Sequence, residues 1–123
     1  MHIELGAEHV ELAPASVPAG NVYLVLDGPG QGWELVSRGS VATEERSPLD
    51  AAQVERVRAG DLQSTTIELF QVTCAPDAWT AASRWEGCGN VTRLALRPGL
   101  YLIRPPGGEP GVVVPSAVLE VEG

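Results

Sequence analysis

The sequence predicts an all-β fold, a Greek-key β-sandwich of about seven to eight strands with one short helix inserted near residues 48–58. Three observations lead to this prediction. Several short runs alternate apolar and polar residues, as half-buried strands do, because successive side chains of a strand point to opposite faces. Pro and Gly occur 10 and 14 times and separate these runs. Only one segment repeats its apolar residues at helical spacing.

The first part of the chain contains three predicted strands. Residues 2–12 are expected to form one strand with a bulge or bend at Gly6. Residues 21–26 are apolar at nearly every position, so this strand is expected to be buried on both faces and central. A glycine-rich turn leads into residues 33–37, the third strand.

The helical exception spans residues 48–58. Ser47 is predicted to cap its N-terminus, with Pro48 at the first helical position. Asp50 is expected in the first turn, where its charge faces the positive end of the helix dipole. One face of the helix is expected to pack on the sandwich, because apolar residues recur at helical spacing. These residues are Leu49, Ala52 with Gln53, and Val57.

The second part of the chain returns to strand patterns. Residues 65–72 alternate and are rich in β-branched residues, which predicts a strand. Residues 74–90 show no period and are expected to form a loop. Residues 91–96 form the next predicted strand, and a Pro-Gly turn leads from it to residues 100–104, its expected partner. Residues 117–121 close the chain as an edge or final strand.

Length and charge restrict the classes of protein. At 123 residues and 12.9 kDa, residues 1–123 are expected to form a single domain with a mainly aliphatic core, since aromatic residues make up 5%. The net charge of −8 repels phosphate backbones and anionic lipids, so neither nucleic acid nor a membrane surface is an expected partner. Solubility is the simpler explanation of this charge. No apolar run approaches the roughly 18 residues of a membrane span, so membrane insertion is not expected.

The two cysteines, Cys74 and Cys88, enclose a 15-residue segment. A disulfide is the favoured interpretation; two buried free thiols and a metal-binding pair are the alternatives. A metal site would require two further ligands, and no histidine lies near in the sequence. Because disulfides persist in oxidising compartments, we expect an extracytoplasmic bacterial protein, secreted, periplasmic or lipid-anchored, whose export signal was replaced by a start methionine. A cytoplasmic protein is the alternative.

Several stretches together carry a family resemblance. They are PASVPAGNV at residues 14–22, WELV at 33–36, LRPGLY at 96–101 and VLEV at 118–121. These stretches resemble segments of the small cupredoxins, the blue-copper proteins, over perhaps half of the chain in separated pieces. The resemblance implies a cupredoxin-like sandwich.

The copper ligands of that family are not matched here. The resemblance places Trp33 where the first copper histidine usually stands, and Pro105 about where the cysteine would follow. Residues 106–111 contain no histidine, and Met1 is the only methionine. A blue-copper site requires a cysteine, two histidines and usually a weak axial methionine. The resemblance therefore implies a cupredoxin-like domain without a type 1 copper site, and no cofactor is expected.

Tryptophans are the main candidates for a binding surface. Trp33 is either a binding platform at the end of the sandwich or a side chain that fills the core, as large aromatics generally do. Trp79 and Trp85, with Arg84 beside them, lie in the predicted loop and could form an exposed patch for a partner or a sugar. The simpler alternative is a small apolar cluster under that loop.

The remaining polar residues do not indicate catalysis. His2, Glu4 and His9 could form a weak surface metal site, although adventitious binding or none is the favoured interpretation. Both histidines lie in the first nine residues, outside any triad context, and the cysteines are too far apart for a Cys-x-x-Cys pair.

The sequence therefore predicts a non-enzymatic binding or structural module whose partner is an unidentified protein or small molecule. The alternative is a copper-handling or redox protein that uses the N-terminal histidines or the cysteine pair.

Overall fold

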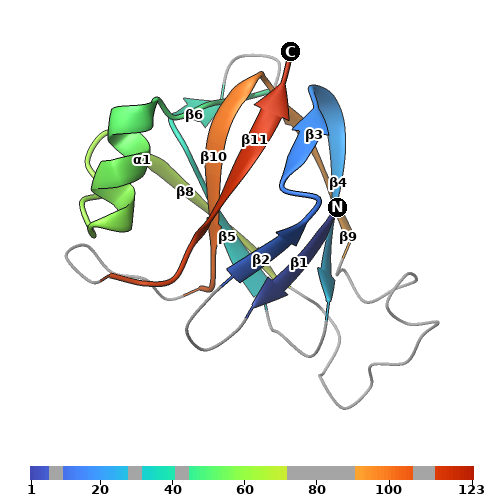
Figure 1. Ribbon diagram of the computed structural model, residues 1–123, viewed down its shortest axis with the longest axis horizontal. Coiled ribbons are helices and arrows are strands. Elements are labelled where there is room, and N and C mark those ends of the chain that lie inside the picture. The colour runs from blue at the N-terminus through green and yellow to red at the C-terminus, as the bar shows by residue number, and fades with distance from the viewer. Residues whose placement is uncertain (6–9, 28–31, 41–44, 72–90, 107–112) are drawn as a thin grey trace.

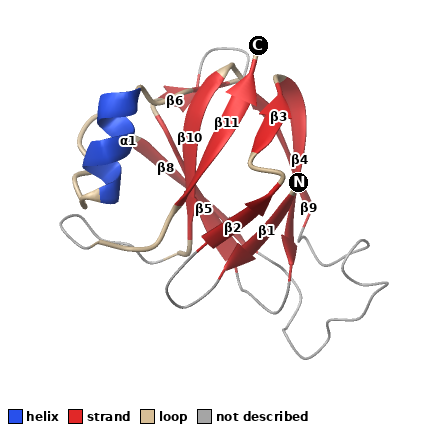
Figure 2. Cartoon of the chain, in the orientation of Figure 1, coloured by secondary structure: helices blue, strands red, loops and turns tan. Residues whose placement is uncertain are grey.

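In a computed structural model of the protein, the described residues are 1–5, 10–27, 32–40, 45–71, 91–106 and 113–123. These residues form two facing sheets and one short helix, which confirms the predicted all-β sandwich (Figures 1 and 2). The strands are β1 (His2–Leu5), β2 (Val10–Ala13), β3 (Ser16–Pro18), β4 (Gly20–Asp27), β5 (Gly32–Ser37), β6 (Gly39–Ser40), β7 (Arg46–Ser47), β8 (Thr66–Gln71), β9 (Val91–Leu96), β10 (Gly99–Arg104) and β11 (Ala117–Glu122). The helix is α1 (Ala51–Arg58).

The described part of the chain has more strands than the sequence predicted, because β3, β6 and β7 are too short to show an alternating pattern. Six strands form one sheet in the order β2-β1-β4-β9-β7-β6, and five form the other in the order β3-β11-β10-β5-β8. The apolar strand β4 lies between β1 and β9, so its predicted central position is confirmed. No helix in the described ranges is both long and apolar enough to cross a membrane.

The N-terminal prediction of one bulged strand is wrong. Residues 2–12 instead contribute two strands, β1 and β2, which pair antiparallel with His2 opposite Ala13 and Leu5 opposite Val10. Ile3 and Leu12 are also opposite each other and both face the core. Because the apolar alternation fits either a bent strand or a hairpin, the pattern alone does not distinguish them.

The predicted pairing of β9 with β10 is also wrong. The two strands belong to different sheets, since β9 pairs with β4 and β7 whereas β10 pairs with β5 and β11. The chain crosses from one sheet to the other between Leu96 and Gly99. Gly99 has a φ of 143°, and a Cβ at this position would lie 2.3 Å from Cβ of Pro48. This crossing therefore requires a glycine.

The interior of the sandwich is mainly aliphatic, as the composition predicts. Alternate residues of both sheets point inward and form one continuous cluster. Its buried members are Ile3, Val10, Val22, Leu24, Leu26, Trp33, Leu35, Leu94, Leu96, Tyr101, Ile103, Leu119 and Val121.

Two polar contacts tie the sheets together at one end. The Tyr101 hydroxyl, on β10, lies 2.7 Å from the carbonyl oxygen of Arg46 and 2.8 Å from that of Arg97, and its one proton is shared between these two acceptors. Arg46 and Arg97 belong to the β7 and β9 side of the sandwich. Burial raises the pKa of Tyr101 to about 12. The Arg46 guanidinium also pairs with Glu68 on β8, at 3.1 and 2.8 Å.

The helix begins three residues later than predicted. The Asp50 carboxylate accepts a hydrogen bond from the Gln53 N–H at 2.8 Å, and Gln53 Oε1 accepts one from the Asp50 N–H at 3.0 Å. This capping box makes Asp50 the N-cap, whereas Ser47 belongs to β7 and Pro48 precedes the helix. Strand pairing holds Ser47 in the sheet, so it cannot adopt the predicted cap position.

The helix covers the outer face of the five-stranded sheet (Figure 1). Its buried residues are Gln53, Val54 and Val57, whereas Ala52, expected on the inner face, is exposed. Because Leu49 lies outside the helix, it does not define the inner face, and Gln53, Val54 and Val57 define it instead. Leu49 is buried as predicted, but it lies before the helix, where it bridges to Leu100 of β10.

Candidate functional site

Trp33 lies inside the sandwich. It is the second residue of β5 and is 1% exposed. Its indole stacks on the Phe70 ring of the neighbouring strand β8, with ring centroids 4.6 Å apart and planes at 23°. This burial favours the core-filling interpretation of Trp33 and makes the indole unavailable as an exposed platform.

The side chain of Trp33 also determines whether the positions that the cupredoxin resemblance assigns to copper ligands could bind the metal. An indole N–H donates hydrogen bonds and offers no lone pair to a metal ion. Pro105, the other position that the resemblance assigns to a ligand, has no donor side chain. Among the described residues, no group of three or more His, Cys, Asp and Glu side chains could hold a metal ion. These residues do not fit the copper ligand set.

A buried ion pair lies next to Trp33 on the other face of the same sheet. Arg104 on β10 is opposite Glu34 on β5, and its Nε donates to Glu34 Oε1 at 2.9 Å. Arg104 is 1% exposed and Glu34 is 9% exposed. Charges are rarely buried to this extent unless they are paired, because desolvation is costly. The sequence signal for this pair is a glutamate between Trp33 and Leu35 in a mostly apolar strand, but the alternation does not identify its partner.

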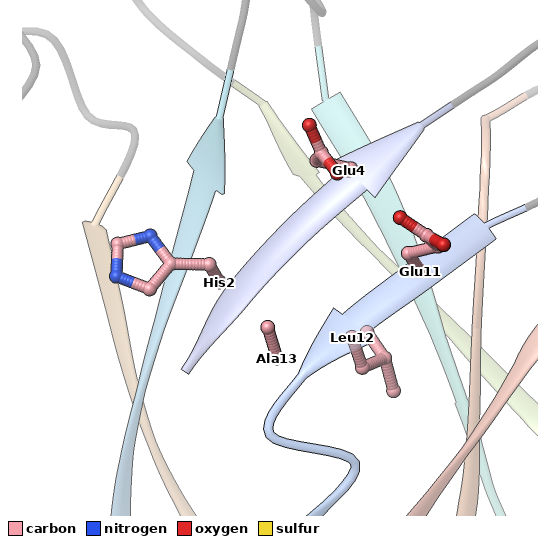
Figure 3. Close-up of a pocket in the computed structure, with 5 residues that line it drawn as sticks. All are labelled: His2, Glu4, Glu11, Leu12 and Ala13. Carbon is pink, nitrogen blue, oxygen red and sulfur yellow. The ribbon is translucent and has the colours of Figure 1, made fainter.

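The N-terminal residues His2 and Glu4 lie on the solvent side of β1, which runs between the edge strand β2 and β4 in the six-stranded sheet. With Glu11, Leu12 and Ala13 they line a shallow pocket of about 310 Å³ (Figure 3). Figure 3 shows the His2 imidazole pointing away from the two carboxylates. His9, the third residue of the hypothetical metal site, lies outside the described residues. The structure therefore places two members of this hypothetical site, and the site itself stays a prediction.

Acidic residues stand in register across this part of the sheet. Glu4 is directly opposite Glu11 on β2, and it is also the register partner of Asp27 on β4. Like charges at directly opposite positions repel each other. The opposition of Glu4 and Glu11 is a consequence of the antiparallel pairing of β1 with β2, so a prediction of one continuous strand could not find it.

The outer face of the six-stranded sheet also carries an exposed aromatic residue. Tyr23 on β4 is 55% exposed and lies opposite Arg93, an exposed residue of β9. A second shallow pocket, of about 270 Å³, adjoins it. Its lining residues are Met1, Val17, Pro18, Ala19, Asn21, Val22 and Tyr23. The exposed Tyr23 and Arg93 on this face contrast with the outer face of the five-stranded sheet, which packs against α1.

The other predicted site residues lie in one segment outside the described residues. They are Cys74, Trp79, Arg84, Trp85 and Cys88. The disulfide and the aromatic patch therefore stay predictions.

Comparisons of the chain with protein-family models, with curated proteins and with solved structures find no match.

Proposed function

We propose that this protein is a non-enzymatic, extracytoplasmic binding or structural module, built on a Greek-key, cupredoxin-like scaffold that has no type 1 copper site. The observation that carries this proposal is the burial of Trp33. Its indole packs on Phe70 in the core, at the position that the cupredoxin resemblance assigns to the first copper histidine. A side chain that fills this space with carbon atoms stabilises the sandwich through burial and leaves no ligand for copper.

The proposed recognition surface lies in the segment that carries Trp79, Arg84 and Trp85. Trp33 is not part of it, because its side chain is in the core. Tryptophan and arginine are the residues that contribute most strongly to binding when they are presented at a surface. The partner is a protein or a small molecule rather than a nucleic acid, since the net charge of −8 opposes binding to phosphate backbones.

Single-tryptophan variants test the recognition surface. We compare acrylamide quenching of the fluorescence in three variants that each retain one tryptophan, with phenylalanine at the other two positions. The expected result is weak quenching for Trp33 and strong quenching for Trp79 and Trp85. Equal, weak quenching at all three positions would mean that the segment folds over its tryptophans, and the proposed surface would be wrong.

The alternative function, copper handling or redox chemistry, is tested by titration with Cu²⁺. We compare the wild-type chain with a His2→Ala/His9→Ala double variant at micromolar metal. No histidine-dependent binding is the expected result, and saturable binding that the double variant loses would favour the alternative.

A thiol count on the unreduced protein tests the predicted disulfide and, with it, the expectation that the protein is extracytoplasmic. No reactive thiol is expected for a disulfide, whereas two reactive thiols would remove the argument for an extracytoplasmic protein.

A further inference from the structure

The outer face of the five-stranded sheet is apolar beneath α1. Val36 on β5 and Leu102 on β10 are fully buried there, and they form a cluster distinct from the core of the sandwich. Leu49, Val54 and Val57 complete this cluster from the side of the helix. Without the helix, Val36 and Leu102 would form an apolar strip in contact with water.

The helix is held to this strip by few side chains. Only Gln53, Val54 and Val57 are buried, and Gln53 is polar. The Gln53 amide is engaged within the segment, where it accepts from the Asp50 N–H at 3.0 Å and donates to the Ser64 carbonyl at 3.5 Å. Two valines are therefore the apolar contribution of α1 itself. A helix of eight residues is not stable alone in water, so its persistence depends on these contacts.

Both points where the helical segment leaves the sandwich are anchored by other bonds. Before α1, the Leu49 N–H donates to the Leu100 carbonyl at 2.7 Å, and Arg38 Nε donates to the Pro48 carbonyl at 2.8 Å. After α1, the strand β8 begins at Thr66, in register with β5. Residues 50–65 can therefore separate from the sheet while the ladders on either side remain paired.

We propose that residues 50–65 open as one unit, separately from the sandwich, so that α1 is a removable cover over the Val36 and Leu102 strip. Regions held by few buried apolar contacts open at a lower free energy than the core that supports them. The sandwich is held by a continuous core across both sheets, whereas the cover is held by Val54, Val57, the partly buried Leu62 and its caps.

Native-state hydrogen exchange of the full chain tests this proposal over a series of low denaturant concentrations. Amides of Val54, Ala59 and Gly60, which are bonded within the helical segment, are compared with those of Leu102 and Ile103 on β10. We expect the α1 amides to have protection factors lower by about tenfold or more, and to share one shallow, non-zero dependence on denaturant. Slopes of zero with a different rate for each amide would indicate fraying and overturn the proposal. Identical rates and slopes for α1 and β10 would also overturn it, because the segment would then open only with the whole domain.

Two substitutions of a buried aliphatic residue by alanine distinguish opening of the cover from opening of the core. Val57→Ala removes a contact between the cover and the sheet, which destabilises the native state relative to both the open-cover state and the globally unfolded state, so α1 amides and β10 amides should both exchange about tenfold faster. Leu94→Ala, in the core of the sandwich, should accelerate β10 amides and leave α1 amides unchanged. Acceleration of the α1 amides by the same factor as the β10 amides in Leu94→Ala would contradict separate opening, because the cover would then open only together with the core.

Discussion

At the scale of single residues, the structure shows polar side chains where the sequence pattern leads one to expect apolar ones. Glu34 and Arg104 are both buried and are cross-strand partners. Tyr101 is fully buried, yet its hydroxyl meets two backbone carbonyls. Alternation identifies which face of a strand a residue occupies, but not which residue of a distant strand faces it. For that reason the strands of this pair could be predicted and the pair itself could not.

Two ion pairs of the protein differ in burial. The Glu34–Arg104 pair is buried, and the Arg46–Glu68 pair is partly exposed. The side chains of the second pair are 19% and 23% exposed. We expect a double-mutant cycle with alanine to give a coupling of about 2 kcal/mol or more for Glu34–Arg104, and at most about 1 kcal/mol for Arg46–Glu68. The measurement is the free energy of unfolding by urea. Equal couplings would show that burial does not strengthen the interaction.

The Tyr101 hydroxyl gives stability a dependence on alkaline pH. Its pKa is raised from 10.0 to about 12 in the folded protein, so between these values the unfolded chain ionises and the folded protein does not. The contribution of the hydroxyl to the free energy of unfolding is therefore complete below pH 10 and is lost as the pH rises from 10 to 12. A shift of two units corresponds to roughly 3 kcal/mol. We expect the wild-type protein to lose stability over this range relative to Tyr101→Phe, which has no hydroxyl to ionise. Parallel pH profiles of the two proteins in urea unfolding would contradict the raised pKa.

At the scale of elements, strand bounds followed from the sequence more closely than strand partners did. The predicted strands at residues 21–26, 33–37, 65–72 and 91–96 each lie within one residue of an observed strand at both ends. Partners depend on contacts between distant residues, so the predictions for β1 with β2 and for β9 with β10 were wrong. The helix cap was misassigned for a related reason, because pairing places Ser47 in the sheet.

Replacement of Ser47 and Asp50 tests the position of the cap. Asp50→Ala removes the carboxylate that accepts from the Gln53 N–H, and we expect a loss of about 1 kcal/mol in the free energy of unfolding. Ser47→Ala should change it by less than about 0.5 kcal/mol, because this residue does not cap the helix. A larger loss for Ser47→Ala than for Asp50→Ala would show that Ser47 caps the helix, as the sequence predicted.

Gly20 and Gly99 both have positive φ, but only Gly99 lies in close contact with another residue. Comparing alanine substitutions at the two positions therefore distinguishes the cost of backbone strain from the cost of a steric clash. A Cβ at Gly99 would meet Pro48 at 2.3 Å, whereas at Gly20, with φ of 112°, nothing lies within 4 Å. We expect Gly20→Ala to cost about 1 kcal/mol and Gly99→Ala at least about 2 kcal/mol more, as measured by thermal or urea unfolding. Similar losses at the two positions would show that Pro48 yields easily.

At the scale of the whole molecule, the fold class follows from alternation, turn residues and one helical segment, and the structure confirms it. The arrangement of the strands into two mixed sheets could not be predicted, because parallel pairs such as β1 with β4 and β3 with β11 join segments far apart in the chain. The candidate site was predictable only in part. Trp33 could be singled out by its residue type and position, but its burial on Phe70 depends on the pairing of β5 with β8.

We propose that this sandwich has no type 1 copper site, since Trp33 fills its core at the position that the cupredoxin resemblance assigns to a ligand. The most direct measurement is a metal analysis of the purified protein together with the visible spectrum after addition of copper. We predict a metal-free, colourless protein that develops no intense band. An intense blue band would show that a cysteine thiolate and histidines bind copper in this protein, and the assignment of Trp33 and Pro105 to the ligand positions would be wrong.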